Sequence, residues 1–441
     1  MARGKMRRIA AAVAGILFSV AAYSQTEGTF SGYSPYSVYG IGNLHSLGNA
    51  YSFSRGGTGI ADRNHRFMNI LNPASVTARD SLSFMADFGL SGKASLFRDG
   101  NSKGIGNIYN ISDFAISFPL WRNAAFMVGL TPFSDIGYST TTTEKSSEGE
   151  SSIGYTGSRT YAAGGTGSVY QLFAGGGVTL WNRLSIGAQY MFLFGNIDKY
   201  SSVSFSESSF RSIAAGDTIQ VKASTVKFGL QYEQPLGGNY KLSLGATYRM
   251  KAAMRGQSIA YDYWSMSSDG NRISRAETPL KGEGLSFGDE LGAGLSFRKG
   301  DKWAVQMDYT RGNWTGTGFD SFRGFMNNSS HPFTGGIAQS IRGGFEIVPN
   351  ANDIRHYLNR ATYRAGAYFE QSYYKVDGKP LGTVGITLGA TLPVYIWYNG
   401  LTVALEAGYT GLGGAPVKET FFSFHVGFNI FDIWFRKYQY E

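Results

Sequence analysis

The sequence contains no cysteine among its 441 residues. This excludes disulfide bonds, cysteine-ligated iron–sulfur clusters and thiolate zinc sites. Charged residues are also scarce, at 16% of the chain, whereas an ordinary soluble domain has about 25%. Repeated apolar runs of about 20 residues, which a polytopic helical membrane protein needs, do not occur. The sequence therefore excludes metal and redox sites built on cysteine, and it excludes a polytopic helical membrane protein.

Glycine and aromatic residues are abundant instead. The chain has 60 Gly, 28 Tyr, 31 Phe and 7 Trp, and a mean hydropathy of −0.17. Disordered chains are poor in aromatic residues, so this composition favours a folded chain. The composition indicates a protein that is rich in aromatics without being apolar overall.

The first 24 residues have the pattern of a secretory signal peptide. Four basic residues among the first eight precede an apolar stretch at 9–22, and Ala22-Tyr23-Ser24 supplies small residues for cleavage after Ser24. The alternative is a membrane-anchoring helix, for which the stretch is short. Removal of this peptide lowers the formal net charge from +9 to +5. No basic stripe remains, so we expect no nucleic-acid partner.

From residue 81 onward, apolar residues alternate with small or polar ones, which is typical of strands with two different faces. Residues 241–248 and 401–409 are clear cases. The pattern predicts about fourteen strands. Their expected spans are 81–91, 110–120, 124–138, 167–181, 184–201, 218–233, 239–262, 281–298, 302–316, 336–348, 361–375, 381–392, 400–410 and 419–432.

The connections between these strands alternate in length. Short turns follow the second, fourth, sixth and eighth strands, and long polar connections follow the odd-numbered ones, the longest at 139–166. The alternation is less regular near the C-terminal end of the chain, where the turn at 349–360 is long and the connection at 376–380 is short. Such alternation is typical of an antiparallel transmembrane β-barrel, in which every backbone group is paired within the lipid. The alternative, a large soluble all-β protein such as a propeller, would need a repeat of about 40–50 residues, which the sequence lacks.

We therefore predict four parts of the chain. They are a signal peptide at 1–24, a plug (hatch) segment at 25–80, a barrel at 81–435 and a polar C-terminal tail at 436–441. The lumen of a fourteen-stranded barrel is too wide for side chains alone to fill, so we expect the glycine-rich segment to occupy it. Glycines 56, 57 and 59 permit positive φ and close approach, and Asn72-Pro73 favours a turn before the first strand. The alternative is a periplasmic tail.

The motifs of this segment are Arg55-Gly56-Gly57-Thr58-Gly59 and Asn72-Pro73-Ala74. Their order and their distance from the first strand resemble the start of the FadL family of outer-membrane transporters for hydrophobic compounds. The resemblance implies a divergent member, with a hatch inside a fourteen-stranded barrel. In the family the arginine follows the first glycine, whereas here Arg55 precedes Gly56. Ligand-pocket residues cannot be transferred from the resemblance.

Pro132 lies inside the third predicted strand, where it cannot donate a ladder hydrogen bond. The resemblance implies a kink of this strand at Pro132, because the third strand of FadL family members is kinked and opens a lateral exit for hydrophobic ligands. The alternative is a proline in a bulge or near a membrane interface.

No catalytic or nucleotide-binding motif is found in the sequence, so we expect neither an enzyme nor a cofactor. For the five histidines we expect hydrogen-bonding or surface roles rather than metal binding. We expect passive uptake of a hydrophobic or amphipathic small molecule across the outer membrane of a Gram-negative bacterium, with the membrane lipids and this ligand as partners. The second hypothesis is a FadL-like subunit or scaffold of an outer-membrane secretion or assembly complex, with protein partners. A transporter should contain an apolar pocket, and a scaffold should have a filled lumen.

Overall fold

The computed structural model describes residues 34–46, 48–80, 83–100, 102–145, 157–206, 210–265, 272–281, 284–320, 332–353, 355–394, 400–414 and 417–433. The predicted signal peptide and polar tail lie outside these residues. Among the described residues, no helix is long and apolar enough to cross a membrane.

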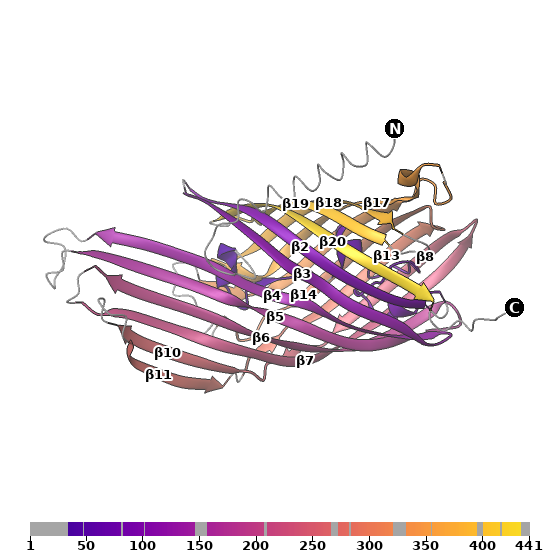
Figure 1. Cartoon of the computed structure of the whole chain (residues 1–441). Helices are drawn as coiled ribbons and strands as arrows, with labels where there is room; N and C mark the ends of the chain where they lie inside the picture. The colour runs from indigo at the N-terminus through magenta and orange to yellow at the C-terminus, as the bar shows by residue number, and fades with distance from the viewer. Residues whose placement is uncertain are drawn as a thin grey trace. The chain divides into compact units, whose positions relative to one another are not determined.

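Fourteen antiparallel strands form a closed barrel, as the sequence predicted (Figure 1). Each pairs with the next along the chain, and the last, β20, pairs with the first, β2, from Ser83↔Ile433 to Arg98↔Lys418. The fourteen are β2 (Ser83–Asp99), β3 (Ser102–Trp121), β4 (Ala124–Lys145), β5 (Ser158–Leu180), β6 (Leu184–Phe205), β7 (Ser212–Gly237), β8 (Tyr240–Arg249), β13 (Asp289–Lys299), β14 (Trp303–Asn313), β16 (Ile337–Ile347), β17 (Thr362–Val376), β18 (Lys379–Pro393), β19 (Gly400–Leu412) and β20 (Lys418–Ile433).

Shorter elements are attached to this barrel. Strands β1 (Asn43–Leu44), β10 (Gln257–Ser265), β11 (Arg272–Lys281) and β15 (Phe333–Gly335) extend its sheet, and β9 (Ala252–Ala253) pairs with β12 (Ser286–Phe287). The short helices are η1 (Pro35–Val38), α2 (Ala50–Phe53), η2 (Pro73–Thr77) and η4 (Tyr357–Arg360).

The alternating pattern of each strand separates an apolar outer face from a polar inner face. On β8, Leu244 and Tyr248 are 50% and 39% exposed, whereas Ser243 and Thr247 are each 5% exposed. A soluble barrel would show the opposite arrangement. Apolar residues outside and polar residues inside are what a barrel surrounded by lipid requires.

The two ends of the barrel differ in their connections. At one end, here called the short-turn end, Trp181 and Asn182 have φ of 48° and 56° in the tight turn between β5 and β6. The start of β2 and the end of β20 lie at this same end, because Ser83 pairs with Ile433. The opposite end is the loop end. There Asp377 and Gly378, with φ of 52° and 75°, join β17 to β18 directly, so the connection at 376–380 is a true two-residue turn.

Strands β4 to β7 are twice as long as a membrane requires. They have 22 to 26 residues, against 10 or 11 in β8, β13, β14 and β16, and about 9–11 residues span a bilayer. Their surplus forms a wall at the loop end, to which the β10–β11 hairpin is added along β7 (Figure 1).

This wall corrects two details of the sequence prediction. Much of the expected loop at 139–166 is strand, since β4 and β5 pair as far as Lys145↔Ser158. The seventh expected strand, 239–262, ends as a barrel strand at Arg249, and its continuation pairs with β7 and β11 as β10. Alternation of apolar and polar residues indicates that a strand has two different faces. It does not indicate which strand is its partner.

Inside the loop end lies a buried cluster of apolar residues, here called the loop-end cluster. Its aromatic residues come from η1 and the residue after it, from β12, from the connection after β14 and from the end of β17. They include Tyr36, Tyr39, Phe287, Trp314, Phe319, Tyr373 and Tyr374, and they pack against aliphatic residues of the wall such as Ile136, Ile197 and Ile219. The cluster packs residues of the N-terminal segment against the inner faces of β4 to β7 at this end.

Candidate functional site

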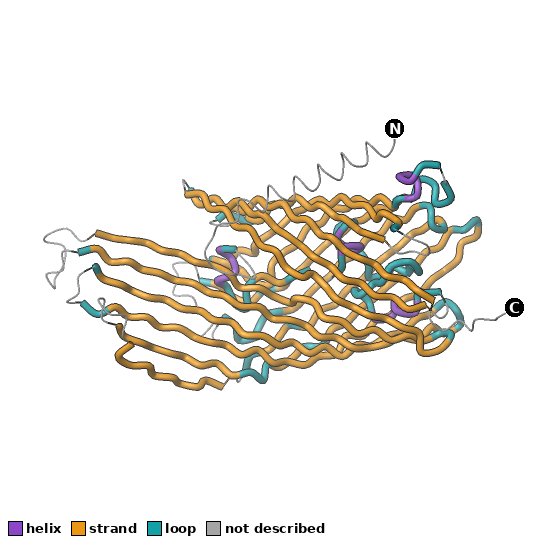
Figure 2. Tube along the Cα trace, in the orientation of Figure 1, coloured by secondary structure: helices purple, strands orange, loops and turns teal. Residues whose placement is uncertain are grey.

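The described part of the N-terminal segment, residues 34–80, lies against inward-facing side chains of many strands. Helix α2 contacts β19 and β20, and η2 contacts β4 to β7. In Figure 2 the short purple helices of this segment lie among the orange strands. The candidate site is therefore the interior of the barrel, where this segment meets the wall.

The glycine motif is one of the places where the segment approaches the wall closely. Gly56 has φ of 74°, and its amide donates to Thr387 Oγ1 at 2.8 Å. Gly57 has φ of 76°, and a Cβ there would lie 2.1 Å from Nη1 of Arg342. Gly59 is outside the left-handed region, but its amide donates to Asp308 Oδ2 at 2.6 Å. Side chains at these positions would strain the backbone or push the segment off the wall.

Arg55 of the same motif is fully buried and forms an ion pair within the segment. Its Nη2 lies 2.8 Å from Asp62 Oδ2, and Tyr51 donates to the same oxygen at 2.9 Å. Two strand residues complete the arrangement, because Arg298 and Gln306 donate to Asp62 Oδ1 at 3.0 and 2.8 Å. Asp62 thus joins the N-terminal segment to β13 and β14.

A second buried pair extends this network. Arg364 Nε donates to Glu346 Oε2 at 2.8 Å, and Glu346 Oε1 lies 3.8 Å from Arg298 Nη2. The guanidinium of Arg364 lies over the rings of Tyr51 and Phe67. We call the set of Arg55, Asp62, Arg298, Glu346 and Arg364 the ion-pair network.

The Asn72-Pro73-Ala74 motif begins helix η2. The Asn72 side chain accepts from the amide of Ala74 at 3.0 Å, and Pro73 takes the first helical position, where a missing N–H costs nothing. Two wall glycines make room for it. A Cβ on Gly187 would lie 2.5 Å from the carbonyl carbon of Pro73, and one on Gly229 would lie 2.0 Å from Asn72 Oδ1. The motif is thus a helix start that is fitted to a glycine-lined part of the wall.

Pro132 lies where the wall of the barrel loses its pairing. Strands β3 and β4 pair from Trp121↔Ala124 to Phe114↔Leu130, and no pairing between them is found beyond Leu130 in the described residues. On its other side β4 stays paired with β5, with a bulge between Pro132 and Ser134. The unpaired stretch between β3 and β4 toward the loop end is here called the seam.

The N-terminal segment covers the free edge of β4 at the seam. Strand β1 pairs with it at Asn43↔Asp135 and Leu44↔Ser134, and the amide of His45 donates to Phe133 O at 2.9 Å. Backbone groups that would otherwise be unpaired within lipid are therefore satisfied from inside the barrel. Pro132 is thus both a bulge residue and the start of a separated stretch of wall.

Two cavities meet at the seam. A groove of about 560 Å³ on its outer side is lined mainly by apolar residues, among them Leu90, Ile111, Phe114 and Leu130. A cavity of about 410 Å³ inside the barrel, here called the lumen cavity, lies on the other side. Both are lined by Ser91, Asn110 and Asp135. Asn110 on β3 donates to Asp135 on β4 at 3.4 Å, so the boundary between the cavities is polar.

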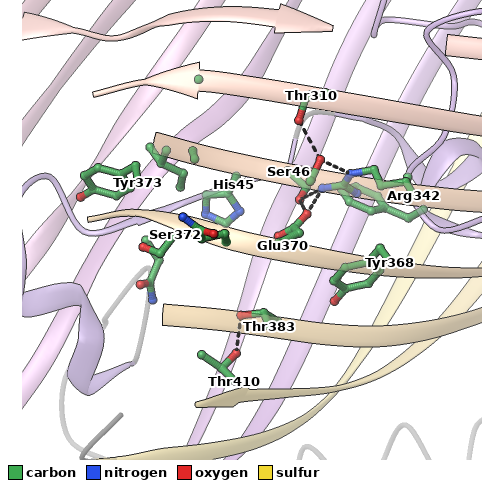
Figure 3. A pocket seen from close by; sticks show the side chains of 18 of the residues that line it. His45, Ser46, Thr310, Arg342, Tyr368, Glu370, Ser372, Tyr373, Thr383 and Thr410 are labelled. Atoms are coloured by element: carbon green, nitrogen blue, oxygen red, sulfur yellow. Dashed lines mark hydrogen bonds and ion pairs between the residues drawn. The ribbon is translucent and has the colours of Figure 1, made fainter. Parts of the chain in front are cut away.

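The lumen cavity is lined by charged and hydroxyl side chains, many of them bonded to each other. Figure 3 shows Arg342 between Ser46 and Glu370, and Thr383 bonded to Thr410. His45 also contacts Asp135. In the described residues no group of three His, Asp or Glu side chains is arranged to hold a metal ion. For a transporter we expected an apolar pocket in the lumen, but the lumen cavity has a mixed lining of charged, hydroxyl and apolar side chains. The mainly apolar groove lies on the outer side of the seam.

Sequence reasoning missed most of this site. Asp62, Arg298, Glu346 and Arg364 are separated by up to about 300 positions, and no motif connects them. The available signal was weak. A charged residue at an inward position of an alternating strand, such as Arg298 or Glu346, indicates a partner in the lumen without identifying it.

Comparison with known proteins gives a family and a fold. A family model described as BamG matches residues 6–441. None of the curated proteins matches the chain. The chain is similar to solved structures described as the CymD monoaromatic hydrocarbon channel (14% identity, TM-score 0.56, 86% of this chain and 96% of that one), the toluene transporter TodX of Pseudomonas putida (16%, 0.55, 88% and 98%) and a FadL homologue of Pseudomonas aeruginosa (11%, 0.54, 86% and 98%).

These likenesses confirm the predicted FadL-type barrel fold. The barrel indicates an outer-membrane location. The similar structures are described as channels or transporters. At identities of 11–16% they establish the fold and not the ligand.

Proposed function

The chain belongs to the BamG family, and we propose that it is an outer-membrane barrel that lets hydrophobic or amphipathic small molecules cross passively by way of the seam. The observation that carries this proposal is the meeting of the apolar groove and the lumen cavity at Ser91, Asn110 and Asp135. A solute that crosses here has to pass the Asn110–Asp135 hydrogen bond and the N-terminal segment, but no pairing between β3 and β4.

The interior of the barrel supports a lateral path over an axial one. At the loop end the loop-end cluster packs the N-terminal segment against β4 to β7. Toward the short-turn end the ion-pair network joins the N-terminal segment to β13, β16 and β17. We infer that this segment, as part of the plug at 25–80, closes the axis of the barrel and leaves the seam as the route. The energy source would be the solute gradient alone.

Pro132 has a specific role in this proposal. Its nitrogen has no hydrogen to donate, and the pairing of β4 with β5 has a bulge beside it. The proline would thus keep the wall from closing. Toluene and other monoaromatic hydrocarbons are the first solutes to test, because similar structures are described as channels or transporters for them.

The test is uptake by reconstituted protein. The initial rate of toluene entry into proteoliposomes should exceed that of empty liposomes and of liposomes that hold an unrelated barrel. It should also rise in proportion to the concentration gradient without an added energy source. A rate equal to that of empty liposomes, for toluene and for octanol alike, would contradict transport.

A second candidate function is a subunit of an outer-membrane protein assembly or secretion complex. The observation that favours this function is that the carboxylates inside the barrel already have partners within the chain, namely cations, hydroxyls or amides. The family description, BamG, points the same way. Purification in a mild detergent, followed by mass spectrometry of both lipids and proteins, separates the two. A stoichiometric protein partner supports the subunit, and extractable solute without one supports the channel.

A further inference from the structure

Asp87 on β2 and Asp113 on β3 are two carboxyl residues buried on the inner side of the wall, where they are 4% and 0% exposed. The register of the two strands shifts just after Gly89, which pairs with Asp113. Asp113 is therefore opposite a residue without a side chain. A Cβ on Gly89 would lie 2.1 Å from Asp113 Oδ1. The glycine thus leaves the room in which the Asp113 side chain lies beside that of Asp87.

Each of the two carboxyl groups has one oxygen that is bonded elsewhere and one that is not. Asp87 Oδ2 accepts from Asn49 Nδ2 at 3.2 Å, and Asp113 Oδ1 accepts from Ser112 Oγ at 2.8 Å. For Oδ1 of Asp87 and Oδ2 of Asp113, both buried, no donor is found within the described residues. The two carboxyl groups are within hydrogen-bonding reach of each other. A hydrogen bond between two carboxyl groups requires a proton on one of them, so a single proton would satisfy both remaining oxygens.

The surroundings of the pair offer little to offset two negative charges. In the part of the chain that the structure describes, the titratable groups that act on the pair are the two carboxyls themselves and His425 of β20. The residues opposite Asp87 are uncharged, namely Ala115 on β3 and Asn429 on β20. From the N-terminal segment the pair meets the Asn49 amide. Two carboxylates buried side by side repel each other, and one shared proton removes this repulsion.

The pair is connected to the N-terminal segment through Asn49. This residue is the N-cap of α2 and is 1% exposed. The amide nitrogen that donates to Asp87 also donates to the carbonyl of Met68 at 2.9 Å. One side chain therefore joins the start of α2, the later part of the segment and strand β2.

We propose that Asp87 and Asp113 form a proton-binding pair, and that their shared proton keeps this part of the N-terminal segment attached to the wall. In the unfolded chain the two carboxyl groups are separate and hydrated, and they lose their protons near about pH 4. The folded chain retains one proton above this pH, so the stability that the pair contributes is lost as the pH rises. Asp62 acts in the opposite sense, because its ion pairs fail in acid.

The first measurement is infrared spectroscopy of the purified barrel in a nonionic detergent at neutral pH, which separates a carboxylic acid from a carboxylate. We expect a carboxylic-acid band in the wild-type chain that decreases in Asp113→Asn and in Asp87→Asn, because an amide donates the hydrogen bond in place of the acid. Asp62→Asn is the matched control. Asp62 is also buried, but Arg55 and Arg298 bind it as a carboxylate, so its loss should leave the band unchanged.

The second measurement is the rate at which trypsin cuts within residues 34–80. The wild-type chain and Asp113→Asn are compared at the same pH, which cancels the pH dependence of the protease. We expect the ratio of the wild-type rate to the variant rate to rise several-fold from about pH 6 to about pH 9, because only the wild-type pair has a shared proton to lose.

A band that both asparagine variants reduce, together with a rising ratio of rates, supports the proposal. A band that both variants retain, or no band in the wild-type chain, overturns the shared proton. In the second case, a metal ion found in equimolar amount with the chain would identify a cation between the two carboxylates instead. A ratio that does not change with pH overturns the link to the segment.

Retained heat-modifiable migration shows that each variant folds, and Asp87→Asn replaces Asp113→Asn in the trypsin measurement if the latter does not fold. The pair does not depend on transport through the seam. Toluene uptake enters neither measurement, so their failure would leave the proposed function standing.

Discussion

Arg298 on β13 donates a hydrogen bond to Asp62 of the N-terminal segment at 3.0 Å, and the two side chains are 10% and 0% exposed. A buried ion pair therefore joins the segment to the wall across 236 positions of sequence. Because Arg55 binds the other oxygen of the same carboxylate, Asp62 is the residue on which the attachment of the segment depends most.

Substitution of Asp62 should release the segment. Asp62→Asn leaves Arg55 without the carboxylate that it binds and leaves Arg298 with Glu346 alone, at 3.8 Å. Breaking a buried pair costs about 3–5 kcal/mol. We expect a lower urea midpoint, measured by heat-modifiable migration, and faster proteolysis within residues 34–80. The control is Arg66→Met, which removes the more exposed pair between Arg66 and Asp301 and should cost about 1 kcal/mol or less. Equal effects of the two variants would contradict the role given to Asp62.

The same attachment should weaken in acid. Burial raises the pKa of the Asp62 carboxyl, but the charges of Arg55 and Arg298 outweigh this and lower the pKa from 3.8 to about 2. A lowered pKa stabilises the folded state above the unfolded value, and the contribution, about 2 kcal/mol, is lost as the pH falls from about 4 through 2. Unfolding midpoints across this range should fall less steeply in Asp62→Asn than in the wild-type chain. Parallel curves would show that Asp62 is not the titrating group.

Pro132→Val should reduce uptake. Valine restores an amide hydrogen and favours a regular strand, so β4 can approach β3 next to Leu130, before the edge that β1 covers, and narrow the seam. We expect a several-fold slower toluene uptake with unchanged heat-modifiable migration. Pro235→Val is the control, since Pro235 also lies at a bulge but between β7 and β8 near a short turn. Unchanged uptake of every hydrophobic solute by Pro132→Val would remove the proline from the route.

The orientation in the membrane gives a further prediction. Both chain ends should lie in the periplasm, because the short turns of outer-membrane barrels face that side. A protease site inserted near Ser147 should be cut in intact cells, and one near Gly237 should be protected. The reverse result would place the loop end in the periplasm.

The sequence predicted the wall of the barrel better than its contents. Alternation follows from lipid outside and polar groups inside, so the fourteen strands could be located, most of them within a few residues at the short-turn end. The same rule could not show that residues 257–265 leave the barrel to pair beside β7. The partner of a two-faced strand is decided by long-range register.

The candidate site was predictable only where the backbone required particular residues. The positive φ of Gly56 and Gly57 and the helix start at Asn72-Pro73 are backbone conformations that only certain residues adopt easily. Such requirements involve neighbouring residues, so they can be recognised in the sequence as motifs. The ion pair of Asp62 with Arg298 depends on which strands are opposite each other in the closed barrel. The seam exists because β3 does not pair with β4 beyond Leu130. Pro132 was the residue of the sequence that pointed to it.

The most direct test of the seam as the route is to cross-link it reversibly. The chain has no cysteine, so Asn110→Cys with Asp135→Cys places the only two thiols on opposite sides of the seam, where a short reducible cross-linker can join them. A control pair, Ile186→Cys with Leu230→Cys, joins two strands that are already paired. The account predicts that cross-linking at the seam stops toluene uptake by proteoliposomes, that reduction restores it, and that the control pair has no effect. Uptake that continues unchanged with the seam joined would contradict the account.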